Sequence, residues 1–76
     1  MSFFTPEEAD KLVGTSVRAK CRIQKQICDI PEGMSGKVTE KSWFGHQGRC
    51  FVVVTFDSHD VCGMDKTEWN NFVEVS

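Results

Sequence analysis

The amino-acid sequence predicts a mainly β fold, a small barrel of five strands with a short N-terminal helix and one helical turn before the last strand. Two observations predict it: several short segments alternate apolar with polar residues, and turns that contain Gly or Pro separate these segments. The chain has 76 residues, of which 39% are hydrophobic, so it can build one modest core. We expect a single domain over residues 1–76, with a helical lead-in at 1–14 and the barrel at 15–76.

The residues that cap helices predict the helical lead-in. Thr5 can cap the following turn, Pro6 suits the first helical position, and Glu8 completes a Thr-x-x-Glu capping box. Gly14 is typical of the residue after a helix end. We therefore expect a short helix between Thr5 and Gly14.

The first strand is predicted over residues 17–24, where apolar and polar residues alternate. One face carries Val17, Ala19, Cys21 and Ile23, and the other carries Arg18, Lys20, Arg22 and Gln24. Residues 31–36 read Pro-Glu-Gly-Met-Ser-Gly and must turn sharply, because proline fixes one backbone angle and glycine permits positive φ. A second strand follows at residues 36–41, with Val38 pointing inward.

Residues 50–56 give the strongest strand signal, a continuous run of apolar and β-branched residues. Apolar side chains project from both sides of this run, so we place it at the centre of the sheet and expect cover on both faces, in part from the N-terminal helix. Residues 57–60 form a polar turn, and a short strand returns at residues 61–64.

The end of the chain combines a helical turn with the last strand. Asp65 and Glu68 have the spacing of a second capping box, but apolar strand residues follow soon after. We predict one helical turn and then a final strand that carries Phe72, Val73 and Val75.

Three segments near the end of the chain carry a resemblance to known families. Residues 52–57 read Val-Val-Val-Thr-Phe-Asp, Gly63 and Met64 follow, and residues 69–75 read Trp-Asn-Asn-Phe-Val-Glu-Val. This pattern resembles the end of the E-type accessory-subunit family of photosystem I and is similar to the variable chain of ferredoxin:thioredoxin reductase, two SH3-like barrels. The resemblance covers roughly the last sixty residues. It implies a five-stranded SH3-like barrel that docks on a redox or multisubunit complex and carries no cofactor of its own.

Charge and composition bound the class of function. Nine Lys and Arg against eleven Asp and Glu give a formal charge of −2, without the basic excess that drives binding to phosphate backbones. No run of apolar residues is long enough to span a membrane, and the first residues lack the pattern of an export signal, so we predict a cytoplasmic location. The four cysteines form no Cys-x-x-Cys pair, and we expect reduced thiols that serve packing, with Cys28 the most exposed.

Residues 42–48 form a predicted hairpin loop that carries Trp43, Phe44 and His46. Large aromatic side chains in a loop flanked by glycine are a common way to present a binding surface. The alternative is that Trp43 folds back over an open end of the barrel. If Trp69 on the helical turn approaches Trp43, the two side chains line a groove for a peptide; the sequence has no tyrosine for a tyrosine-lined proline-peptide groove.

Arg18, Lys20 and Arg22 form a basic face on the first strand, and Lys25 follows them. The ordinary interpretation is a solvated strand face, and the functional one is contact with an acidic protein surface. Binding of nucleic acid is the alternative, and it requires aromatic side chains beside these cations for base stacking.

Neither a metal site nor a catalytic site is predicted. His59 and Cys62 are three positions apart and could gather with Cys50 or His46, but this spacing is a weak signal for a metal site. The serines and the acidic residues near His59 lie in turn segments, where such residues are expected without catalysis. We expect no enzyme activity, no metal and no cofactor.

The sequence therefore predicts a non-enzymatic protein-interaction or accessory-subunit module. The predicted contact residues belong to the aromatic loop, the helical turn and the basic face: Trp43, Phe44, His46, Trp69, Arg18, Lys20 and Arg22. The alternative is a nucleic-acid-binding small barrel, because SH3-like barrels bind peptides, RNA or DNA and the fold alone does not choose among them.

Overall fold

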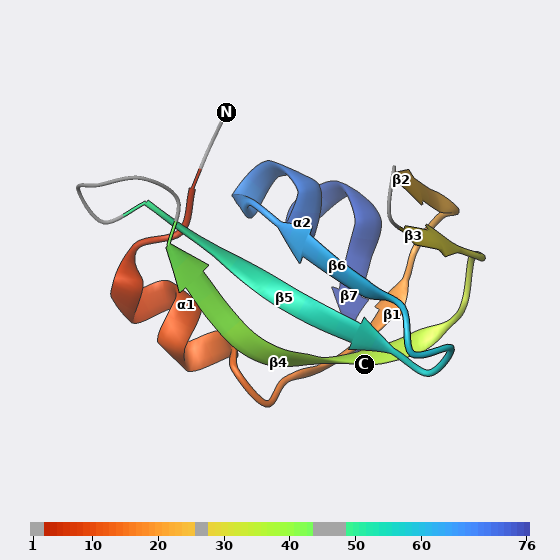
Figure 1. Cartoon of the computed structure of the whole chain (residues 1–76), viewed down its shortest axis with the longest axis horizontal. Helices are drawn as coiled ribbons and strands as arrows, with labels where there is room; N and C mark the ends of the chain where they lie inside the picture. The colour runs from red at the N-terminus through yellow and green to blue at the C-terminus, as the bar shows by residue number, and fades with distance from the viewer. Residues whose placement is uncertain (1–2, 26–27, 44–48) are drawn as a thin grey trace.

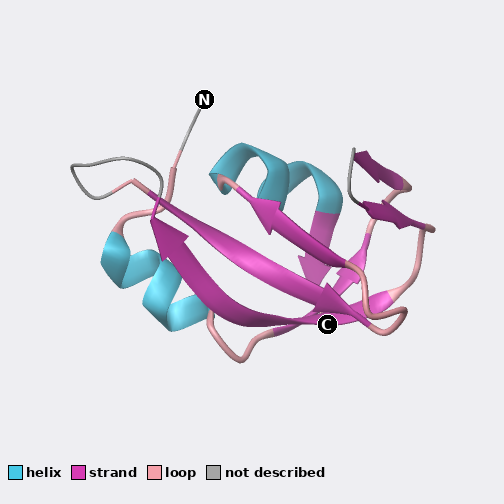
Figure 2. Ribbon diagram, in the orientation of Figure 1, coloured by secondary structure: helices cyan, strands magenta, loops and turns pink. Residues whose placement is uncertain are grey.

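Two long strands, β4 and β5, cross the molecule side by side, with helix α1 toward one end and a small hairpin of β2 and β3 at the other (Figures 1 and 2). The structure is a computed structural model that describes residues 3–25, 28–43 and 49–76. Within these ranges neither helix has the length and apolar character needed to cross a membrane. The elements are α1 (Pro6–Leu12), β1 (Ser16–Ala19), β2 (Ile23–Lys25), β3 (Cys28–Ile30), β4 (Ser35–Trp43), β5 (Cys50–Phe56), β6 (Val61–Met64), α2 (Lys66–Phe72) and β7 (Val73–Val75).

Five of the strands form one antiparallel sheet in the order β6-β5-β4-β1-β7, which confirms the mainly β prediction. The sequence predicts residues 50–56 as the central strand; in the sheet β4 is the middle strand of the five, and β5 is an interior strand between β4 and β6. A β-bulge between Val38 and Glu40 interrupts the β4–β5 register, and bulges bend the strand that carries them. The sheet is open, with β6 and β7 at its edges, and closure into a barrel stays a prediction.

The core lies on the sheet face that α1 covers. Phe56 and Met64 are among the largest fully buried side chains, and Ala9 of α1 is buried with them. On the opposite face of β5, Val53 is also buried, and the half-buried Phe51 ring lies over Gly63 of β6. Both faces of β5 are therefore covered in part, as its continuous apolar run predicts.

Helix α1 begins and ends where the sequence predicts. The Thr5 hydroxyl accepts a hydrogen bond from the Glu8 N–H, and Glu8 Oε1 accepts one from the Thr5 N–H at 3.0 Å, so the capping box is complete. The helix ends at Leu12, and Gly14 follows with a φ of +93°, a conformation that favours glycine. The Gly14 N–H donates to the Val38 carbonyl at 2.8 Å, which joins the end of α1 to β4.

The predicted strand over residues 17–24 is wrong in length. Strand β1 ends at Ala19, and the chain resumes extended structure at Ile23 in the separate β2–β3 hairpin. Strand β1 ends because its neighbour β7 begins only at Val73. The hydrogen bond from the Lys20 N–H to the Phe72 carbonyl, of 2.7 Å, marks the end of the pairing between the two segments. The predicted apolar face still holds in β1 and at Ile23, whose side chain is buried.

Helix α2 is longer than the single turn that the sequence predicts. Asp65 and Glu68 form a complete capping box, but the helix continues to Phe72, which the sequence assigns to the last strand. The side chains of Trp69 and Phe72 pack against the core, and such packing stabilises a second turn that local propensity alone does not favour. Only Val73–Val75 remain for β7.

A disulfide between Cys28 and Cys62 joins the β2–β3 hairpin to edge strand β6. The expectations that these thiols are reduced and that Cys28 is exposed are therefore wrong; Cys28 is only 5% exposed. The fold brings the two Cα atoms to 6.4 Å, within disulfide range, although the residues are far apart in sequence. Lys25 adds a second link, because its ammonium donates to the Gly63 carbonyl of β6 at 2.7 Å.

Candidate functional site

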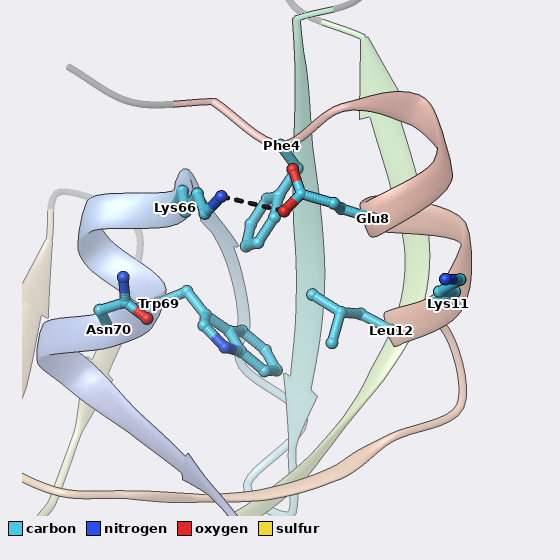
Figure 3. A pocket seen from close by; sticks show the side chains of 7 residues that line it. All are labelled: Phe4, Glu8, Lys11, Leu12, Lys66, Trp69 and Asn70. Atoms are coloured by element: carbon cyan, nitrogen blue, oxygen red, sulfur yellow. Dashed lines mark hydrogen bonds and ion pairs between the residues drawn. The ribbon is translucent and has the colours of Figure 1, made fainter.

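A groove opens between α1 and α2, with β5 behind it (Figure 3). Its volume is about 300 Å³, at the small end of the range for ligand pockets. We call it the interhelix groove and define it by the residues that line it: Phe4, Glu8, Lys11, Leu12, Lys66, Trp69 and Asn70.

The floor of the interhelix groove is apolar. Leu12 from α1 and Trp69 from α2 point toward each other, and the Phe4 ring lies between the two helices (Figure 3). The Phe4 and Trp69 rings make an edge-to-face contact, with centroids 6.2 Å apart and planes at 82°. Phe4 is held in place by two backbone hydrogen bonds with Cys50 of β5, of 2.9 and 3.1 Å.

An ion pair between Glu8 and Lys66 bridges the two helices at one end of the groove (Figure 3). Glu8 Oε2 accepts from the Lys66 ammonium at 2.9 Å, while Glu8 Oε1 accepts from the Thr5 N–H. One carboxylate therefore caps α1 and also links it to α2. Glu68 combines the same two roles, because its Oε1 caps α2 and its Oε2 pairs with the ammonium of Lys25 on β2 at 2.6 Å.

Acidification is expected to weaken the contact between α1 and α2. The hydrogen bond from the Thr5 N–H, and then that from Lys66, hold the pKa of Glu8 below its ordinary value. A carboxyl group with a lowered pKa in the folded state contributes stability above its unfolded pKa, about 4.3 for Glu. That contribution is lost as the pH falls through the folded pKa. Thermal unfolding as a function of pH, with an NMR titration of the Glu8 carboxyl carbon, measures both effects.

A Lys66→Met variant is the control for this titration. Its Glu8 pKa should move only part of the way back toward the ordinary value, because the hydrogen bond from Thr5 is the larger cause and remains. A Glu8 pKa that is the same in the native protein and in Lys66→Met would contradict the bridging role of this carboxylate.

The structure places the two predicted tryptophans in different surroundings. Trp69 lines the interhelix groove, whereas Trp43, at the end of β4, is 57% exposed and is not among the lining residues. Trp43 does lie near the groove along the sheet, because Cys50 pairs with Trp43 on one side and with Phe4 on the other. The other two predicted contact residues of the loop, Phe44 and His46, lie outside the described residues.

The cations of the predicted basic face are engaged by other groups of the protein. Arg18 pairs with Glu74 at 2.9 Å, and the Lys20 ammonium donates to the Asn70 carbonyl at 2.6 Å. Arg22 makes two hydrogen bonds to the carboxylate of Asp29, which raise the pKa of Arg22 and lower that of Asp29. Two of the three cations, Arg18 and Arg22, are therefore neutralised by carboxylates, whereas the hydrogen bond of Lys20 to a carbonyl leaves its charge uncompensated.

Metal ligation through Cys62 conflicts with the structure, because its sulfur is bonded to that of Cys28. Within the described ranges, no three side chains of the His, Cys, Asp and Glu types gather as a metal site would require. Cys50 is buried in the core, and Cys21 is half-buried with its thiol directed at the Asn71 carbonyl.

The sequence predicts Trp69 as a contact residue but not the groove that surrounds it. The signal that could find the groove is the pair of capping boxes, because each fixes the start of a helix and so the positions of Leu12 and Trp69. The sequence has no local signal for the approach of the two helices, because that approach depends on the sheet between them. Comparisons with protein-family models, curated proteins and solved structures find no match to this chain.

Proposed function

We propose that this protein is a non-enzymatic protein-interaction module that acts as an accessory subunit, and that its partner contacts the interhelix groove. The observation that carries the proposal is the apolar floor, where Leu12, Trp69 and Phe4 border an open hollow of about 300 Å³. Aromatic side chains that line a pocket are typical of the energetic centre of protein interfaces. The charged side chains around the floor match the polar rim of such interfaces.

Trp43 extends the proposed contact surface beyond the groove. Residues paired across antiparallel strands lie about 5 Å apart, so Trp43 lies two such steps from Phe4 through Cys50. An indole that is 57% exposed gains by being covered in a complex. Phe44 and His46 follow Trp43 in the sequence and remain part of the proposed contact.

The proposed architecture is a small SH3-like barrel. A five-stranded antiparallel sheet with a bulge in its central strand supports this proposal, because bulges supply the bend that barrel closure needs. The resemblance to accessory subunits of redox complexes extends the proposal to the class of partner, a redox or multisubunit complex.

Binding of nucleic acid is less well supported than binding of a protein. It would use Arg18, Lys20 and Arg22, yet two of these cations are paired with carboxylates and the third donates to a backbone carbonyl. Phosphate binding would have to displace those partners, which lowers the expected affinity.

The test is a capture experiment from lysate of the source organism, with the native protein and a Trp43→Ala variant as baits. We expect the native bait to retain one protein in stoichiometric amount and the variant to retain at least tenfold less, a loss typical of an interface tryptophan. Because Trp43 is exposed, thermal unfolding of the variant should stay close to that of the native protein.

Two results would contradict the proposed function. One is capture of nucleic acid alone, with a steep dependence on salt concentration. The other is equal capture of the same protein by both baits, because the Trp43 indole would then contribute nothing to the contact. The capture is run with and without a reductant, because disulfides are typical of oxidising compartments and the cytoplasmic location stays a prediction.

A further inference from the structure

The interhelix groove offers three kinds of chemistry within one small hollow. Leu12 and Trp69 supply apolar surface, and Asn70 beside Trp69 supplies a side-chain amide. Among the described residues, no hydrogen-bond partner engages that amide, whereas the backbone carbonyl of Asn70 accepts from Lys20. Lys11 on the opposite wall supplies an ammonium group.

The charges around the groove favour an anionic ligand. Two lysines, Lys11 and Lys66, and a single acidic residue, Glu8, line the groove. Both oxygens of Glu8 are already engaged, one by Thr5 and one by Lys66. Lys11 is exposed and, within the part of the chain that the structure describes, forms no ion pair, not even with Glu7 one turn before it.

We propose, on the basis of the proposed function, that the groove binds a peptide segment of the protein partner in which an apolar side chain is followed by an acidic residue. The apolar side chain packs between Leu12 and Trp69. The Asn70 amide donates to and accepts from the peptide backbone, and the acidic side chain pairs with Lys11. The peptide would then cover the open side of the apolar floor, and among the described residues neither the Asn70 amide nor the Lys11 ammonium has another partner.

A peptide fits these features better than other ligands of the same charge. A side-chain amide can donate and accept at once, which matches the N–H and C=O of a peptide group. A volume of about 300 Å³ accommodates a short stretch of side chains, whereas drug-sized cofactors need larger and more enclosed pockets. Nucleic acid is disfavoured because, of the two lysines that line the groove, Lys66 is already paired with Glu8 and, among the described residues, only Lys11 is free to pair with phosphate.

The test uses an acetylated and amidated nonapeptide, Gly-Ser-Gly-Leu-Asp-Glu-Gly-Ser-Gly, titrated into the isotope-labelled oxidised protein and followed by NMR. We expect the largest shifts at the indole N–H of Trp69, the methyl groups of Leu12 and the side-chain amide of Asn70. A peptide with Ser in place of Leu should bind at least tenfold more weakly, because the apolar contact is lost. A peptide with Lys-Lys in place of Asp-Glu should also bind at least fivefold more weakly.

The variant that tests the charge contact is Lys11→Glu, which we expect to weaken binding of the acidic peptide about fivefold to tenfold. The matched control is Lys37→Glu, since Lys37 is an exposed lysine of β4 outside the groove and is likewise free of ion pairs among the described residues. Lys37→Glu should leave the affinity within about twofold of native, and high salt should reduce the difference between the two variants.

The proposal is overturned if the basic and acidic peptides bind equally, if the shifts lie outside the groove, or if no peptide binds. A cross-linking experiment, with a photoreactive phenylalanine derivative in place of Asn70, distinguishes failure of the peptide proposal from failure of the proposed function. If it cross-links a protein segment without an apolar–acidic sequence, the peptide chemistry is wrong but the interaction module stands. If it cross-links no protein and no peptide binds, both proposals fail.

Discussion

Loss of the Cys28–Cys62 disulfide is expected to lower the free energy of unfolding by about 3–4 kcal/mol. The bond closes a loop with a sequence separation of 34. The loss of conformational entropy that such a loop imposes on the unfolded chain corresponds to this free energy. For a domain of this size the midpoint of thermal unfolding should fall by on the order of 20 °C. Urea unfolding of the native protein with and without a strong reductant, and of a Cys28→Ala/Cys62→Ala variant, measures the loss.

The control for this prediction is a Cys21→Ser variant, which retains the bond and changes a half-buried thiol. Its free energy of unfolding should stay within about 1 kcal/mol of native, and a reductant should still destabilise it fully. If mass spectrometry counts four free thiols in the purified protein, or if the reductant leaves the unfolding curve unchanged, the disulfide between β3 and β6 does not form.

Truncation of Phe56 is expected to produce the largest effect of a single substitution. Phe56 is 1% exposed at the end of β5 and belongs to the core cluster, and Phe→Ala changes in cores cost about 3–5 kcal/mol. A small domain has a total stability of about the same size, so Phe56→Ala should be largely unfolded at 37 °C. Circular dichroism and urea unfolding at lower temperature quantify the loss, with the half-buried Phe51 of the same strand as the matched control.

Gly36 of β4 gives an independent check on the position of the Phe56 ring. A Cβ atom at Gly36 would lie 2.9 Å from Phe56 Cδ1 and 3.0 Å from the Thr55 carbonyl oxygen, so Gly36→Ala should cost about 1–3 kcal/mol. In a Phe56→Ala background the ring is gone, and the same change should cost less. Additive effects of the two substitutions would show that the ring does not lie over Gly36.

The starts of both helices could be predicted because their signals are local. In each case the cap residue and a glutamate three positions later exchange hydrogen bonds with each other's backbone, at Thr5 and Glu8 and at Asp65 and Glu68. Such signals are complete within one turn of chain. The end of α2 could not be predicted in this way, because packing of Phe72 on the core decides it.

The buried and exposed faces of the strands could be predicted, but the residues at which the strands end could not. Alternation correctly identifies Val17, Ala19 and Ile23 as buried, since the side-chain period of a strand depends only on the backbone. The end of β1 at Ala19 depends instead on β7, whose pairing is a property of the whole sheet.

Neither the interhelix groove nor the disulfide could be predicted from the sequence, and the physical reason is the same for both. Each joins segments that are distant in sequence, Glu8 with Lys66 in one case and Cys28 with Cys62 in the other. Their proximity is decided by the topology of the sheet, and spacing along the chain carries no signal for it.

The position of β1 between β4 and β7 has a consequence for synthesis on the ribosome. Arg18 and Glu74 are paired across these strands although 56 positions separate them in sequence. A nascent chain therefore cannot complete its sheet until β7 has left the exit tunnel, and until then β1 has a partner on one side only. We infer that the sheet is completed last at its β7 edge and waits for residues 73–75 to emerge, whatever the speed at which the local helices form.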